Sequence, residues 1–172
     1  ESVPHDLGGD DLALLAFPSL DLPMSAQVRR NDLAIALKPM DASTRIPTTM
    51  GLGPLPIAAA AVGNVDEAAR WIERNAAPDM FKPPFNVRSE TATNNTGYFL
   101  TGSGGFVQSL LYGLSGLRIE PQGLIQAYPP VLPPTWKSMT LKNISFRGSH
   151  YDITIDRDVT GKPRLSRKLI LT

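Results

Sequence analysis

Residues 53–76, GPLPIAAAAVGNVDEAARWIERNA, decide how the first part of this chain folds. The segment 53–63 is nearly all apolar, is entered at prolines and ends at a glycine, which predicts a buried helix. The segment 64–76 starts with Asn64 and Glu67 in a spacing related to the capping box, and its small and apolar residues fall on one face. An inner helix followed by an outer amphipathic helix predicts a layered helical array.

Three further helices are predicted around this pair. They cover residues 10–18, 25–37 and 104–116, and the second has Ser25 as its N-cap and Pro39 as its stop. The last is apolar almost all round, so it is expected to be deeply buried. We therefore expect the first two-thirds of the chain to be helical.

The character of the chain changes after residue 116. The stretch 117–128 is β-like, and a proline-rich connector follows at 129–134. The remaining stretches alternate polar with apolar residues, as half-buried strands do. We predict an α+β fold, with helices over 1–116 and a small antiparallel β unit over 117–172. Neither part closes on itself, which is typical of the C-terminal portion of something larger.

Composition argues against several classes of partner and cofactor. The net charge is +1, from 17 basic and 16 acidic residues, and no basic run stands out, so nucleic acid and acidic membranes are poor partners. The chain has no cysteine, and its two histidines, His5 and His150, lie far apart in sequence. We therefore expect no metal site and no cofactor. No apolar run reaches the roughly 18 residues that a membrane-spanning helix needs.

A stiff polar loop carries the candidate chemistry. In residues 81–108, FKPPFNVRSETATNNTGYFLTGSGGFVQ, Glu90 lies between a proline pair and a glycine-rich turn. We expect an extended segment that places Asn86, Arg88 and Glu90 on one face, while Phe85 and Val87 pack inward. A rigid loop between two buried helices is a good mount for a catalytic carboxylate. The residues alone leave a second interpretation open, in which Glu90 is a solvated surface charge paired with Arg88.

Three motifs resemble glycoside hydrolase family 65, on its acid trehalase side. They are PPFNVRSET, YFLTGSGGFVQSLLYGLSGLRI and LPPTWKSMTLKNISFRGSHYDITID. The resemblance implies the last helices of an (α/α)6 barrel followed by a small antiparallel β-sandwich unit. It also implies an inverting hydrolase of α-glucosides, with α,α-trehalose as the expected substrate. In the hydrolases of that family the glutamate matching Glu90 is the general base, and we expect Asn86 and Arg88 to contact the substrate.

The resemblance also implies a missing partner. An inverting glycosidase needs a second carboxyl group roughly 6.5–9.5 Å from the base. Four other acids of the helical part lie in no matching motif: Asp10, Asp11, Asp32 and Asp41. We therefore expect a larger N-terminal chain or segment to supply the general acid, and this chain alone to be inactive. Phosphorolysis by the same family and a non-catalytic β module that binds carbohydrate or protein stay open. A secreted, vacuolar or periplasmic location is expected.

Overall fold

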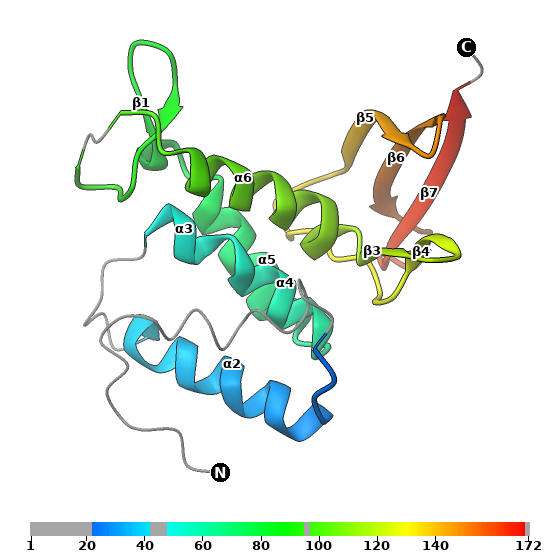
Figure 1. The fold of residues 1–172 in the computed structure, drawn as a ribbon, viewed down its shortest axis with the longest axis horizontal. Coiled ribbons are helices and arrows are strands. Elements are labelled where there is room, and N and C mark those ends of the chain that lie inside the picture. The colour runs from blue at the N-terminus through cyan, green and yellow to red at the C-terminus, as the bar shows by residue number, and fades with distance from the viewer. Residues whose placement is uncertain (1–21, 42–47, 95–96, 171–172) are drawn as a thin grey trace.

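The computed structural model describes residues 22–41, 48–94 and 97–170. The helical elements are α2 (Ala26–Asp41), α3 (Thr49–Leu52), α4 (Pro54–Ala61), α5 (Val65–Asn75), a 3-10 turn η2 (Pro78–Met80), α6 (Leu100–Gln108) and a π-helical turn η3 (Ser109–Leu114). The strands are β1 (Phe81–Lys82), β2 (Val87–Arg88), β3 (Leu117–Glu120), β4 (Gly123–Gln126), β5 (Met139–Phe146), β6 (Ser149–Arg157) and β7 (Pro163–Ile170). Figure 1 shows the helices beside a separate group of strands, β3 to β7. The helix predicted at 10–18 lies outside the described residues.

The predicted inner and outer helices are confirmed as α4 and α5. All residues of α4 from Leu55 to Ala60 are buried, and the Asn64 side chain caps α5 by accepting a hydrogen bond from the Glu67 N–H at 3.4 Å. One detail of the apolar face is wrong. Val65 was expected inside but is 46% exposed, whereas Asn75 is fully buried. The stripe that contacts the core begins one turn into α5, which leaves the first turn over solvent.

Helix α2 continues beyond its predicted end. Ser25 caps it as expected, since its Oγ accepts a hydrogen bond from the Val28 N–H at 3.3 Å. Pro39 was expected to stop the helix, but α2 runs on to Asp41. A proline in the last turn removes one backbone hydrogen bond and still allows the following residues to stay helical.

Helix α6 is less buried than its apolar sequence predicts. Gly102 is its one buried residue, while Leu100 and Val107 on the helix are 80% and 59% exposed and Tyr98, just before it, is 74% exposed. The helix then passes into the π-helical turn η3, whose end at Leu114 is buried. Gly116, the last residue of the predicted helix, follows with a φ of +68°, a conformation that glycine adopts without strain. One face of α6 is therefore apolar and uncovered in the described chain.

The strands after residue 116 are antiparallel, as predicted, but they form two separate sheets where one unit was expected. A hairpin pairs β3 with β4, and a three-stranded sheet has the order β5-β6-β7. Strand β6 shows the predicted alternation, with Ile153 and Ile155 fully buried. A bulge between Leu141 and Ile144 interrupts the pairing of β5, with Asn143 at a φ of +56°.

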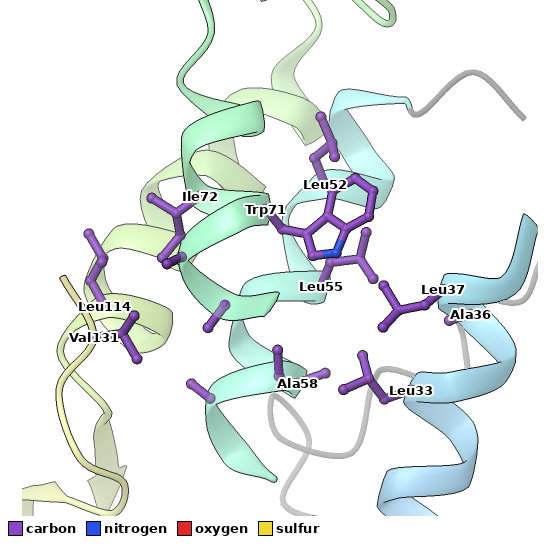
Figure 2. Close-up of a cluster of buried hydrophobic side chains, with 14 of the residues drawn as sticks. Leu33, Ala36, Leu37, Leu52, Leu55, Ala58, Trp71, Ile72, Leu114 and Val131 are labelled. Atoms are coloured by element: carbon purple, nitrogen blue, oxygen red, sulfur yellow. The ribbon is translucent and has the colours of Figure 1, made fainter. Parts of the chain in front are cut away.

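One hydrophobic core joins the helices to the β part. Figure 2 shows α4 and α5 in its centre, with Leu33 and Leu37 of α2 on one side and Leu114 and Val131 on the other. Ile155 belongs to the same cluster. In the described part of the chain, no helix is both long and apolar enough to cross a membrane.

Candidate active site

The loop that carries Glu90 begins with a short hairpin after α5. Strand β1 pairs antiparallel with β2, and Phe81 lies opposite Arg88. The tip of the hairpin, residues 83–86, is exposed, and Asn86 adopts a φ of +52° there. Asparagine tolerates this left-handed conformation better than most residues, so it suits a tight turn. Figure 1 shows the hairpin at one end of the helical part, beyond the start of α6.

Where this hairpin ends, hydrogen bonds from several sides fix the main chain of residues 88–90. The Phe99 N–H donates to the Arg88 carbonyl at 3.0 Å, and the Ser89 N–H donates to the Met80 carbonyl at 3.2 Å. The Thr49 hydroxyl donates to the Ser89 carbonyl at 2.7 Å, and the Thr49 N–H donates to the Glu90 carbonyl at 2.7 Å. Four hydrogen bonds to three elements, α3, η2 and the start of α6, therefore hold three consecutive residues.

The far side of the loop closes on itself. The Ser89 hydroxyl donates to the Asn94 carbonyl at 2.7 Å, and the Thr91 N–H donates to Asn94 Oδ1 at 3.0 Å. The Lys82 ammonium donates to the Ala92 carbonyl at 2.6 Å. These bonds make the segment a compact turn in which Glu90 stays partly exposed. Glu90 is therefore held, partly exposed, on a rigid backbone segment.

Arg88 lies underneath this loop. Its side chain is 5% exposed, and its guanidinium carbon lies 4.8 Å from the ring centre of Phe81 and 4.6 Å from that of Phe106. The same group donates hydrogen bonds to the main-chain carbonyl of Asn75, at 2.8 Å, and to its side-chain oxygen. Burial disfavours the charged form and lowers the pKa of Arg88 to about 10. The arginine stays charged at neutral pH and links the loop to α5.

Asn75 extends this buried polar network to two more elements. Its side-chain amide donates to the Leu52 carbonyl and to the Ser109 hydroxyl, both at 3.3 Å. Asn75 therefore contacts the end of α3, the start of η3 and the arginine of β2 at the same time. In a buried network of this kind, moving one polar group breaks hydrogen bonds of the others. A buried donor or acceptor without a partner lowers the stability of the fold.

The structure separates the three predicted site residues. Asn86 is exposed at the hairpin tip, Arg88 is buried, and Glu90 is partly exposed. The expected shared face is wrong because β2 ends at Arg88, so the alternation of a strand does not reach Glu90. Phe85, which was expected to pack inward, is 76% exposed at the tip.

Asp32 is the one other predicted acid whose side chain the structure describes. Asp32 lies on α2, at the opposite end of the helical part from the hairpin (Figure 1), and burial raises the pKa of its carboxyl group. Asp10, Asp11 and the side chain of Asp41 lie outside the described part of the chain. Among the described residues, no group of three or more His, Cys, Asp or Glu side chains is placed to hold a metal ion.

Two residues of the site escaped prediction. Asn75 had a usable signal, because a polar residue at position 75 follows Ala68 and Ile72 on the buried face of α5. Thr49 had none, since the residue is 40 positions from its partner Ser89 and belongs to a four-residue helix. Only the folded chain brings it to the loop.

Curated sequences show what the chain is similar to. A kojibiose hydrolase from Mucilaginibacter mallensis is 35% identical over 138 residues, which are 78% of this chain and 19% of that protein. A protein-glucosylgalactosylhydroxylysine glucosidase from Danio rerio is 33% identical over 84% of this chain and 21% of that protein. An α,α-trehalose phosphorylase from Geobacillus stearothermophilus is 30% identical over 58% of this chain and 12% of that protein. The chain spans about a fifth of the length of the first relatives it matches.

A solved structure and a family model match this chain as well. The solved structure "Putative kojibiose phosphorylase from human microbiome" matches 93% of this chain and 24% of that chain, with a TM-score of 0.61 and 16% identity. That likeness shows a shared fold. The model of "Glycosyl hydrolase family 65, C-terminal domain" matches residues 127–161. The resemblance read from the sequence motifs is thereby confirmed, and the chain belongs to glycosyl hydrolase family 65.

Proposed function

We propose that this chain is the base-bearing portion of an inverting α-glucoside hydrolase and that Glu90 is its general base. The observation that carries the proposal is the fixed main chain of residues 88–90, which presents one partly exposed carboxylate. A general base must be held within hydrogen-bond reach of the water that it activates. A rigid mount of this kind serves that purpose better than a mobile surface loop.

The proposed reaction uses two carboxyl groups on opposite faces of the sugar. Glu90 takes a proton from a water molecule while the oxygen of that water attacks the anomeric carbon of the glucosyl unit. The glycosidic bond to the leaving oxygen breaks, and a general acid gives that oxygen a proton. We propose that this acid comes from a larger N-terminal chain or segment, since the acids named from the sequence lie in no matching motif and Asp32 lies on α2, away from the loop (Figure 1).

The uncovered face of α6 supports the same arrangement. Leu100 and Val107 on α6, with Tyr98 just before the helix, leave apolar surface exposed. We propose that α2 to α6 are the last helices of an (α/α)6 barrel and that the rest of the barrel covers this face. The chain's share of about a fifth of its relatives leaves ample length for that remainder.

The substrate is proposed as a disaccharide, or disaccharide unit, with a terminal α-glucosyl group. The sequence motifs predict α,α-trehalose, whereas the names of the relatives add kojibiose and glucosylgalactosylhydroxylysine. These share a glucosyl unit that is transferred to water. Assays of the assembled enzyme on the three compounds will identify the linkage through the largest kcat/KM.

Replacing Glu90 by glutamine tests the proposed role. Glu90→Gln keeps the shape of the side chain but removes the base, so kcat should fall by roughly 10²–10⁴-fold. Glu120→Gln, on β3, is the matched control and should keep wild-type kcat. NMR of the first product should show β-glucose, because an inverting enzyme releases the opposite anomer. Wild-type turnover by Glu90→Gln would refute the assignment.

Phosphorolysis is the second candidate, favoured by the names of the trehalose phosphorylase and the kojibiose phosphorylase. In that case phosphate takes the place of water, and the product is a glucosyl phosphate. Turnover that requires phosphate and survives Glu90→Gln would support it. A non-catalytic role for the β part has one supporting feature, an open groove of about 430 Å³ whose lining includes Phe146 and Tyr151. Sugar binding without turnover by the assembled protein would favour that role.

A further inference from the structure

Thr49 makes two hydrogen bonds to the main chain on either side of the Glu90 Cα atom. Its hydroxyl donates to the Ser89 carbonyl and its N–H to the Glu90 carbonyl, each at 2.7 Å. The side chain of Thr49 is fully buried. One residue therefore fixes the two consecutive peptide groups that flank Glu90.

Thr49 is itself held firmly. It opens α3, where the Thr48 side chain accepts a hydrogen bond from the Gly51 N–H at 3.1 Å. On its other side it lies against α6 at Gly102, where an added Cβ atom would lie 2.1 Å from the Thr49 hydroxyl oxygen. The missing side chain of Gly102 is what lets Thr49 fit between α6 and the loop. Its hydroxyl consequently has little freedom to turn away from Ser89.

These contacts determine the direction in which the side chain of Glu90 leaves the main chain. The direction of a Cα–Cβ bond follows from the two peptide planes that meet at the Cα atom, and both planes are bonded to Thr49. A displacement of about 1 Å in a reacting group lowers a rate by on the order of 100-fold. A residue that touches neither sugar nor water can thus control the rate.

We propose that Thr49 is a positioning residue for Glu90 and acts through the carbonyl groups of Ser89 and Glu90. The proposal rests on the role of Glu90 given above. The buried hydroxyl of Thr49 then contributes to the rate of the reaction as well as to the stability of the fold. The effect passes through the main chain, so Thr49 does not need to contact the substrate.

Thr49→Val and Thr49→Ser form the test pair in the assembled enzyme. Valine keeps the shape of threonine and lacks the hydroxyl, whereas serine keeps the hydroxyl. We expect Thr49→Val to lower kcat by roughly 10- to 100-fold with KM changed less than about threefold, because the loss occurs in the transition state. Thr49→Ser should retain at least about half of the wild-type kcat. Thr140→Val is the control, since Thr140 shares a hydrogen bond with Thr154 on the exposed side of the sheet.

The outcomes separate this proposal from the role of Glu90. Glu90→Gln is measured beside the pair: if it keeps activity, the role of Glu90 fails and the inference fails with it. If Glu90→Gln is inactive but Thr49→Val has the wild-type kcat, only the inference about Thr49 is overturned. Equal losses in Thr49→Val and Thr49→Ser would overturn it as well, because the hydroxyl would not be the cause. Active enzyme is quantified from the folded fraction of each variant, so loss of folding does not count as loss of kcat.

Discussion

Replacing Gly102 by alanine is expected to move Glu90 from a distance. Gly102 lies on the buried side of α6, and a Cβ atom there would lie 2.1 Å from Thr49 Oγ1, 2.7 Å from Thr49 Cβ and 2.9 Å from a ring carbon of Phe99. Thr49 bonds to the carbonyls of Ser89 and Glu90, and the Phe99 N–H bonds to the carbonyl of Arg88. The added methyl group therefore pushes on two of the anchors of the loop.

The size of the effect follows from these distances. An ordinary contact begins near 3.4 Å, so the Thr49 hydroxyl must move by about 1.3 Å. A shift of this order at the base lowers kcat by on the order of 100-fold. Overpacking costs about 1–3 kcal/mol, and alanine regains up to about 1 kcal/mol of helix propensity over glycine. We expect a net loss of stability of up to about 2 kcal/mol.

Gly104→Ala is the matched control on the same helix. A Cβ atom at Gly104 would meet no atom within 4 Å in the described chain. It should gain about 0.5–1 kcal/mol from helix propensity and keep wild-type kcat. Urea unfolding and steady-state kinetics of both variants provide the measurements. If Gly102→Ala gains stability like Gly104→Ala and keeps its kcat, the anchoring of Glu90 through Thr49 is refuted.

Two further predictions concern charged groups near the loop. Arg88→Met should destabilise the protein by about 2–4 kcal/mol in urea unfolding, because two buried acceptors on Asn75 lose their donors; wild-type stability with a raised KM would instead place Arg88 against the substrate. The hydrogen bond from Arg74 lowers the pKa of Asp79, so the folded protein binds fewer protons than the unfolded chain between the two pKa values. This contribution is present above the ordinary pKa of an aspartate and is lost as pH falls through the lowered pKa. Asp79→Asn should weaken the pH dependence of the free energy of unfolding between pH 2 and 6. It should change the free energy of unfolding at pH 7 by less than about 1 kcal/mol, because the pair is largely exposed. A pH dependence equal to that of the wild type over this range would contradict the assignment.

Local patterns were enough to find most of the elements. The apolar run in 53–63 and the capped amphipathic pattern in 64–76 predicted α4 and α5, because each helix is specified by its own residues. The alternation around Ile153 predicted β6 for the same reason. The end of α2 was misplaced, since Pro39 lies where the helix is already ending and only the surrounding structure decides the last turn.

The candidate site was predictable only in part. The motif around Glu90 led to the family, but the arrangement of Asn86, Arg88 and Glu90 did not follow from an extended segment, because the strand ends at Arg88. Thr49 was invisible in the sequence, since its role depends on a contact with a residue 40 positions away. The exposed face of α6 also escaped prediction. A pattern that is apolar all round indicates that a helix is covered, without indicating which chain segment covers it.

The dispersed anchors of residues 88–90 set a limit on redesign by loop exchange. Their partners are Thr49, Met80 and Phe99 along the main chain, and Asn75 beneath Arg88. A graft that copied the contiguous loop into another scaffold would leave all of these partners behind and would deliver a carboxylate without a fixed direction. The smallest portable unit therefore extends from α3 to α6. Within that unit, the exposed hairpin tip at 83–86 does not fix the main chain of residues 88–90. The tip is therefore the place where substitutions can be selected for new substrate preferences.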